Sequence, residues 1–230
     1  MKHRPFKMIV LTVFVTIMVS AVIVAQKKAV QPDVTKIPEG KGWKVSGRKV
    51  TVVTDEKHKA VQFDEAAGQG FAWVEGLEFE NGVIEFDVKG KDEAGKSFVG
   101  VAFRGMDDTT QDVVYFRPFN FKAQEEVRRI HAVQYVSHPV FTWRKLREER
   151  NGQYEKAIFP KSDWPAPDPN GWFHARIVVA KPKVSVYVND AKEPSLVVDE
   201  LSDRKGGRVG FWVGEGSGGM FANLKITPSK

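Results

Sequence analysis

The sequence predicts an all-β domain in which two antiparallel sheets pack against each other. Short runs of alternating or β-branched residues, bounded by Gly, Pro, Asn or Asp, recur along most of the chain. No segment shows a long amphipathic helical pattern with capping residues. About a dozen strands without helices require two packed sheets. A chain of 230 residues is long enough for one such domain.

The composition excludes several classes of protein. The chain is 42% hydrophobic and 11% aromatic, which excludes general disorder, and the absence of cysteine excludes disulfide scaffolds and thiolate zinc sites. The formal charge of +6 comes from the N-terminus: residues 1–25 carry three basic and no acidic side chains, and residues 26–59 carry nine basic and four acidic ones. The remaining residues are slightly acidic, so no nucleic-acid partner is predicted.

Residues 1–25 have the pattern of a signal peptide or of an uncleaved N-terminal membrane anchor. A basic start precedes 18 uncharged residues, Met8–Ala25. In both cases we expect the rest of the chain to be exported. It would then be periplasmic, extracellular or membrane-anchored, with the N-terminal segment as the membrane contact. Residues 26–41 are polar and contain proline, which predicts a tether before a single sandwich domain at 42–230.

The predicted strands follow from the alternation and the turn residues between them. They fall at residues 49–54, 60–63, 71–74, 82–89, 98–104, 113–119, 132–136, 173–180, 184–189, 196–198, 208–213 and 219–227. The best helical candidate is the short run 123–129. The glycine-rich segment 214–219 joins two strands and opens no helix, so it predicts a loop and no phosphate cradle.

Strand alternation predicts one open face with room for a ligand. In residues 98–104, Gly100 and Ala102 alternate with large apolar residues, and Arg104 shares their side. Tyr115 and Arg117 share a side of the next strand. We therefore expect Arg104, Tyr115 and Arg117 on the same face.

The segment 100–143 combines planar polar side chains with aromatic ones, as carbohydrate sites do. Planar polar groups exchange hydrogen bonds with sugar hydroxyls, and arginine adds a donor fork that suits carboxylated or sulfated sugars. The predicted ligand-binding residues are Arg104, Tyr115, Arg117, Asn120, Gln134 and Trp143. The alternative is an ordinary sandwich with aromatic core residues and surface arginines.

Candidate catalytic residues are Glu85, Asp87 and His131. Glu85 and Asp87 are two residues apart and therefore lie on the same face of a strand, with about 6.5–7 Å between their backbone positions. This spacing suits the two carboxyl groups of a glycosidase. The same alternation is typical of any solvent-facing strand. His131 is a further candidate for proton transfer.

A calcium site is the one cofactor the sequence suggests. Asp107, Asp108 and Asp112 could supply oxygen ligands from one turn. Their spacing lacks the EF-hand pattern, and aspartates are also common in strand connections. The five histidines are too scattered for a metal motif.

Three stretches carry a family resemblance. Gly82–Lys89 followed by Phe98–Arg104, the hairpin Gly171–Asn189, and Gly207–Trp212 followed by Phe221–Ile226 resemble strands of the concanavalin A-like lectin/glucanase superfamily. Within this superfamily, their sequence pattern most resembles that of 3-keto-disaccharide hydrolase-like domains and laminin G-like domains. The resemblance covers roughly residues 43–228 and implies a jelly-roll sandwich.

The chain departs from the enzymatic patterns of these relatives. Where the keto-disaccharide type usually carries a Tyr-Glu pair, this chain has Tyr115-Phe116-Arg117. Where laminarinase-type glycosidases carry a third acid after Glu85 and Asp87, it has Lys89. The leading hypothesis is therefore an exported carbohydrate-binding module without catalysis of its own. The alternatives are a glycoside-cleaving enzyme of the keto-disaccharide type and a structural or adhesion module.

Overall fold

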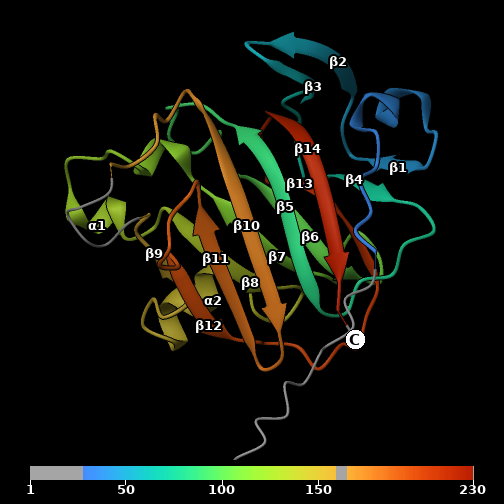
Figure 1. Ribbon diagram of the computed structural model, residues 1–230. Coiled ribbons are helices and arrows are strands. Elements are labelled where there is room, and N and C mark those ends of the chain that lie inside the picture. The colour runs from blue at the N-terminus through green and yellow to red at the C-terminus, as the bar shows by residue number, and fades with distance from the viewer. Residues whose placement is uncertain (1–27, 159–164, 230) are drawn as a thin grey trace, which may run out of the picture.

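The computed structural model describes residues 28–158 and 165–229, and in them two seven-stranded antiparallel sheets pack face to face (Figure 1). The predicted fold class, a two-sheet jelly-roll sandwich, is confirmed. The predicted signal or anchor segment, residues 1–25, lies outside the described residues. Within the described ranges, no helix has the length and apolarity to cross a bilayer.

The first sheet has the strand order β1-β4-β13-β6-β7-β8-β9. Its members are β1 (Trp43–Ser46), β4 (Gly70–Val74), β13 (Arg208–Val213), β6 (Val99–Gly105), β7 (Asp112–Phe116), β8 (Val133–Ser137) and β9 (Glu155–Lys156). Both faces of its central strands are buried, because helices and loops cover the outer face.

The second sheet has the order β12-β11-β10-β5-β14-β3-β2. Its members are β12 (Leu196–Asp199), β11 (Lys183–Val188), β10 (Trp172–Ala180), β5 (Gly82–Lys89), β14 (Gly219–Pro228), β3 (His58–Phe63) and β2 (Val50–Asp55). The β2–β3 hairpin extends beyond the other strands (Figure 1), since β14 pairs with β3 only through Gly219–Phe221.

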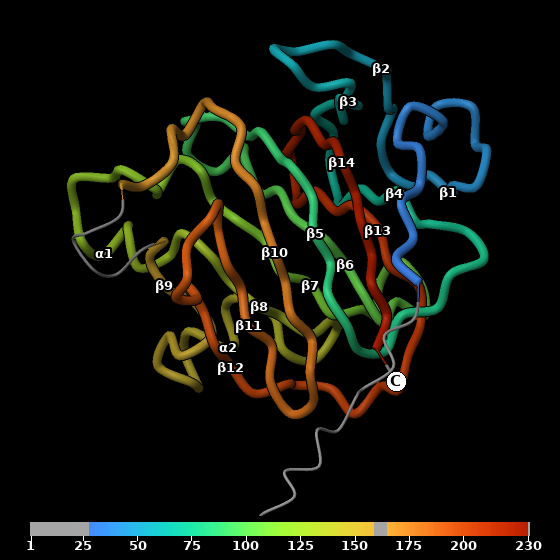
Figure 2. Tube along the Cα trace, viewed as in Figure 1, coloured from blue at the N-terminus to red at the C-terminus, as the bar shows by residue number. Residues whose placement is uncertain are grey.

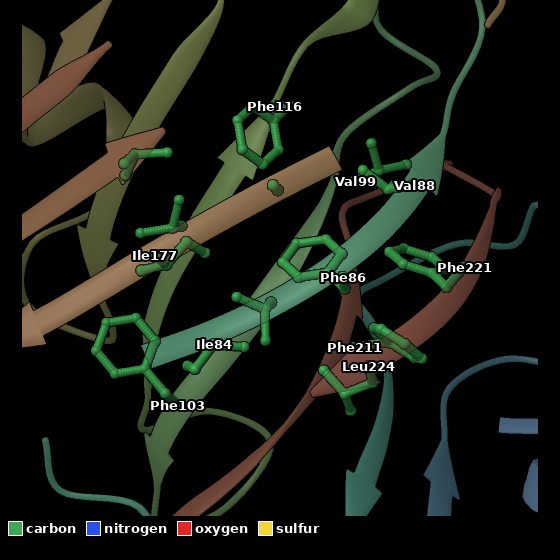
Figure 3. Packing of buried hydrophobic residues seen from close by; sticks show 14 of the residues in the cluster. Ile84, Phe86, Val88, Val99, Phe103, Phe116, Ile177, Phe211, Phe221 and Leu224 are labelled. Atoms are coloured by element: carbon green, nitrogen blue, oxygen red, sulfur yellow. The ribbon is translucent and has the colours of Figure 1, made fainter. Parts of the chain in front are cut away.

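The core lies between the inner faces of the two sheets. Phe211 of β13 stacks on Phe221 of β14 with ring centres 4.6 Å apart, and Phe86 of β5 packs against both (Figure 3). The predicted alternation of β5 is confirmed, because every second residue from Ile84 to Val88 is fully buried. These rings join the two sheets into one hydrophobic core.

The N-terminal part of the domain differs from the prediction. Residues 34–39 form a 3₁₀ helix, η1 (Val34–Glu39), and Val34 and Ile37 enter the core, so this part of the expected tether belongs to the fold. Before it, Val30 pairs with Ile226, so the first described residues run beside the last strand (Figure 2). The polar pattern hid this because only two side chains of the helix are buried.

Short elements account for the other differences. The strands β1 and β9 were not predicted, since β1 buries only Trp43 of its four residues and β9 has only two residues. The helix α1 (Glu126–Arg129) lies inside the predicted run, and η2 (Pro118–Asn120) follows β7. The unpredicted helix α2 (Trp143–Glu149) begins at the N-cap Thr142 and buries only Leu146.

Candidate functional site

A row of cross-strand neighbours on the outer face of the first sheet forms the base of the candidate site. The pairings place Trp212 opposite Gly100, Gly100 opposite Tyr115, Tyr115 opposite Gln134 and Gln134 opposite Glu155. Directly opposite residues on one face are in side-chain contact distance. The row is aromatic toward β13 and polar toward β9.

Gly100 lets the aromatic part of the row close. A Cβ at this position would lie 2.1 Å from the carbonyl oxygen of Val114 and 2.9 Å from the Cβ of Tyr115. Across it, the rings of Tyr115 and Trp212 approach to 5.1 Å between centres. The absence of a side chain at Gly100 thus leaves room for the backbone of β7 and for the Tyr115 Cβ, and the two rings meet across this position.

The polar part of the row is a closed hydrogen-bond network. The Tyr115 hydroxyl donates to Gln134 Oε1 at 2.6 Å, and Arg117 Nη2 donates to both the Tyr115 hydroxyl and Gln134 Oε1. Arg117 Nη1 donates to the carbonyl of His131. Burial raises the pKa of Tyr115 to about 12, so its hydroxyl stays protonated.

Glu155 is the carboxylate of this network. Arg147 binds it through two parallel hydrogen bonds of 2.9 Å, and Arg117 Nη1 lies 3.5 Å from Oε2. Burial by itself would raise the pKa of Glu155, but the Arg147 hydrogen bonds and the charges of Arg147 and Arg117 oppose it, and that pKa is lowered. Glu155 is therefore ionised at neutral pH and holds two arginines.

His131 lies against the same carboxylate. Its Nδ1 is 2.8 Å from Glu155 Oε2, although the two atoms are not aligned as a hydrogen bond. Burial lowers the pKa of His131, Arg147 and Arg117 lower it further, and Glu155 only partly offsets this. The imidazole is therefore neutral at pH 7.

Of these groups, Tyr115, Arg117, His131 and Arg147 border a cavity of about 600 Å³. Five of the fourteen lining residues are aromatic, and the helix α2 contributes Trp143 and Arg147. The Arg147 guanidinium lies 5.2 Å from the centre of the Trp143 ring, which is 42% exposed. The lining residues are Gln69, Phe98, Tyr115, Arg117, Phe119, Asn120, His131, Val136, His138, Trp143, Arg147, Trp212, Gly214 and Glu215.

Two loops, residues 66–69 and 214–217, form the wall of the cavity opposite the Arg117–Glu155 network. Gln69 Oε1 accepts from Trp212 Nε1 at 2.7 Å, and Glu215 Oε2 accepts from the Gly68 amide at 2.9 Å. His138 also lines the cavity, and burial lowers its pKa, with Arg204 adding to the effect and Asp112 opposing it.

Four of the six predicted ligand-binding residues line the cavity. Tyr115, Arg117, Asn120 and Trp143 border it directly, and Gln134 lies beneath, fully buried. Arg104 does not line the cavity: it is fully buried and donates to the Glu80 carbonyl, Asn81 and Glu200.

The position of Arg104 follows from an irregularity in β6. The strand carries one residue more than β13 between the paired positions 102 and 105, and Arg104 has a left-handed φ of 49°. This β-bulge ends the alternation that Gly100 and Ala102 begin, so Arg104 leaves the face that they share.

Glu85 and Asp87 lie on the outer face of the second sheet, whereas His131 lines the cavity on the first. Asp87 accepts from Asn223 and contacts His58 and His174 at 3.3 and 2.7 Å. Glu85 pairs with Lys225 at 2.8 Å. The three catalytic candidates therefore do not form one site.

The three aspartates suggested for calcium are each engaged by protein donors. Asp107 accepts from Thr109, Asp108 accepts from Ser46 and Trp73, and Asp112 binds Ser202 and Arg204. Among the described residues, no group of three or more His, Cys, Asp or Glu side chains is arranged to hold a metal ion.

Four residues of the site were not predicted from the sequence: Glu155, Arg147, Trp212 and Gln69. Trp212 alternates with the inward-facing residues of a predicted strand, so the sequence could have placed its side chain on the outer face of the sheet. Glu155 and Arg147 lie in a long charged insert without periodicity, and only the fold brings them together.

The two packed seven-stranded sheets, with an aromatic-lined cavity on the outer face of one of them, define an all-β jelly-roll sandwich domain. The chain belongs to the 3-keto-alpha-glucoside-1,2-lyase-like domain family, whose sequence profile matches residues 34–227. No curated protein sequence matches the chain significantly.

Solved structures that share the fold include two from Bacillus subtilis. The carbohydrate binding module CBM66 from Bacillus subtilis is 16% identical, with a TM-score of 0.54 over 80% of this chain and 95% of that one. A Bacillus subtilis protein of unknown function with a galectin-like fold is 10% identical, with a TM-score of 0.54 over 89% of this chain and 99% of that one.

Proposed function

We propose that the chain binds a carbohydrate in the cavity on the first sheet. The observation that carries this proposal is the pairing of aromatic rings with fixed polar groups around one space of about 600 Å³. Aromatic rings stack on the apolar faces of sugars, and a few convergent polar groups fix their orientation.

Trp143 and Arg147 are the side chains best placed to contact the sugar. Trp143 is half exposed at the cavity, and the Arg147 guanidinium uses Nε and Nη2 for Glu155, which leaves Nη1 for a ligand. Arg117 already donates to Tyr115, Gln134 and the His131 carbonyl. We therefore assign Arg117 to the support of the site and Arg147 to the ligand.

The charge balance of the cavity favours a neutral sugar. Arg117 and Arg147 share Glu155, and Glu215 lines the opposite wall. Two positive charges thus meet two carboxylates, while both histidines are neutral. The arginines alone had suggested a carboxylated or sulfated sugar, and such sugars form a separate arm of the test.

A glycan array with neutral, carboxylated and sulfated sugars tests the proposal, followed by titration of the best ligand. We expect Trp143→Ala and Arg147→Ala to lower the affinity about tenfold or more. The matched control is Arg176→Ala on the outer face of the second sheet, where Arg176 stacks on Tyr187. Its affinity should stay at the wild-type value.

Two results would contradict carbohydrate binding at this cavity. Absence of binding to every glycan would favour a structural or adhesion module instead. Equal affinities of wild type, Trp143→Ala and Arg147→Ala would place the sugar at another surface.

A second function, elimination at a 3-keto-glucoside, is favoured by the family and by His131. In a 1,2-elimination a base removes the C2 proton beside the C3 ketone, the C1–C2 double bond forms, and the C1–O bond breaks. The leaving oxygen then takes up a proton. We propose neutral His131 as the base, because its lowered pKa keeps the imidazole ready to accept a proton. Ionised Glu155 cannot donate one, which disfavours hydrolysis by a carboxylate pair.

Incubation with methyl 3-keto-α-D-glucopyranoside tests this second function. We expect release of methanol and an unsaturated sugar, both followed by NMR, and a rate at least about a hundredfold lower in His131→Asn. An unchanged rate in His131→Asn would contradict the assignment of the base. Absence of turnover by the wild type would exclude this activity and leave binding alone.

We also propose that residues 1–25 direct export, as a cleaved signal or as an anchor. The basic start and the uncharged run that follows it support this proposal. The intact mass of the full chain after expression in a secreting host separates the alternatives. Loss of about 25 residues indicates a signal peptide, retention in the membrane fraction indicates an anchor, and an intact soluble cytoplasmic chain contradicts export.

A further inference from the structure

Arg48 lies in the turn between β1 and β2, and its buried side chain binds only carbonyl groups. Within the described part of the chain, none of its hydrogen bonds goes to a carboxylate. The guanidinium makes five hydrogen bonds of 2.7–3.3 Å, to the carbonyl oxygens of Gly47, Ala67, Gly68, Gly214 and Ser217. A buried arginine with this many carbonyl partners fixes the backbone segments that carry them.

Four of the five carbonyls belong to two loops far apart in sequence, residues 66–69 and 214–217. These loops also bind each other, since the Gly216 amide donates to the Ala66 carbonyl and the Gly68 amide donates to Glu215. Ser217 Oγ accepts from the Phe98 amide, and the Gly214 amide donates to the Phe98 carbonyl. Among the residues that the structure describes, Arg48 is the one whose side chain donates hydrogen bonds to carbonyl groups of both loops.

The sequence leaves space for this arrangement at two glycines. A Cβ on Gly70 would lie 2.0 Å from Arg48 Cγ, so the arginine stem occupies the place of a side chain at the start of β4. A Cβ on Gly47 would lie 2.2 Å from the Gln69 carbonyl oxygen, and Gly47 has a left-handed φ of 68°. Gly47, Arg48 and Gly70 therefore work as a unit.

The two loops form one wall of the cavity, because Gln69, Gly214 and Glu215 line the cavity. Phe98, whose backbone is bound to the loop 214–217, lines the cavity beside them. We infer that Arg48 is a positioning residue, which sets this wall at its distance from the Arg117–Glu155 network without touching the ligand. The expected effect of Arg48 on ligand binding rests on the proposed function, carbohydrate binding in this cavity. The effect on the wall does not, because Trp212 is held there by Gln69.

The test compares Arg48→Lys with Arg104→Lys. Both arginines are buried, but Arg104 does not line or border the cavity. Lysine has three donors on a single nitrogen and lacks the planar fork with which Arg48 makes its five hydrogen bonds, so Arg48→Lys loses part of the contacts to the two loops. It should lower the affinity for methyl 3-keto-α-D-glucopyranoside about tenfold. Arg104→Lys should lower the Tm and leave the affinity unchanged. Equal loss of Tm with no loss of affinity in Arg48→Lys would overturn the inference.

A second readout does not depend on a ligand. In Arg48→Lys, the Trp212 part of the fluorescence should shift to the red and become more accessible to acrylamide, as judged by subtraction of the same variant in a Trp212→Phe background. Arg104→Lys should show no such change. If the wild type binds no sugar, carbohydrate binding fails while this readout still decides the role of Arg48. An unchanged Trp212 signal overturns that role.

Ser217→Ala covers the case in which Arg48→Lys does not fold. This variant removes the acceptor of the Phe98 amide and keeps the Ser217 carbonyl that Arg48 binds. We expect a smaller change of the Trp212 signal in the same direction. A wild-type Trp212 signal would show that the loop contacts do not set the wall, which contradicts the inference.

Discussion

At the scale of single residues, Glu155 decides how the cavity is held together. It is 3% exposed, and it contacts Arg147, Arg117 and His131. Removal of one buried charge leaves its partners unmatched, which costs more than the pair itself contributes.

We therefore expect Glu155→Gln to lower the free energy of unfolding by about 2–4 kcal/mol. Urea unfolding followed by far-UV circular dichroism measures this. The control Glu149→Gln, at an exposed position of α2, should change the stability by less than about 0.5 kcal/mol. Equal stabilities of the two variants would show that Glu155 is not a support of the fold.

The cavity histidines predict how stability depends on pH. The pKa values of His131 and His138 are both lowered from 6.5, mainly by burial, so the unfolded chain binds protons more readily than the folded one. The contribution to stability is complete above about pH 6.5 and is lost as the pH falls through the lowered pKa values.

The wild type should therefore lose unfolding free energy between pH 7.5 and 5.5, measured by urea unfolding at several pH values. The double variant His131→Asn/His138→Asn should show a smaller loss over this range. A wild-type stability that rises on acidification would contradict the burial effect.

The sequence predicted single residues well only where the strand was regular. Tyr115 and Arg117 share a face because alternation continues through β7. Arg104 left that face because of a bulge that depends on the partner strand β13. Glu155 and Gln134 became neighbours through a two-residue strand, which no local pattern announces.

At the scale of secondary-structure elements, close packing of β6, β7 and β13 shapes the base of the cavity. Gly100 has backbone atoms of Val114 and Tyr115 and the Tyr115 Cβ within 3 Å of the position of a Cβ, whereas Gly206 has nothing nearer than 3.9 Å. A methyl group at Gly100 must push β7 or Tyr115 aside.

Gly100→Ala should thus lower the free energy of unfolding by about 2–3 kcal/mol, while Gly206→Ala changes it by less than about 0.5 kcal/mol. Chemical denaturation of both variants provides the measurement. Similar stabilities would mean that the strands relax without cost and that the glycine is not required by packing.

The elements that the sequence predicted are those with long, regular burial patterns. The ranges of β5 and β13 match the prediction, since six to eight residues suffice to show an alternation. The helix α2 escaped prediction because it buries only Leu146, yet it supplies Trp143 and Arg147 to the cavity. Tertiary contacts bring Trp143 and Arg147 to the cavity, and the short burial pattern of α2 does not predict these contacts.

At the scale of the whole molecule, the two sheets carry different outer faces. The outer face of the second sheet holds side chains that pair with one another, such as Asp87 with His174 and Glu85 with Lys225. The outer face of the first sheet is covered by α2 and loops that enclose the cavity. The fold was predictable from strand alternation and turn residues. Which outer face carries the cavity was not, because α2 and the loops that enclose the cavity show no such pattern in the sequence.

The most direct test of carbohydrate binding in this cavity is a crystal structure with the best ligand from the glycan array. We predict a sugar ring stacked on Trp143, with a hydroxyl within hydrogen-bond distance of Arg147, above the row from Trp212 to Glu155. A sugar bound to the outer face of the second sheet, with an empty cavity on the first, would contradict the account.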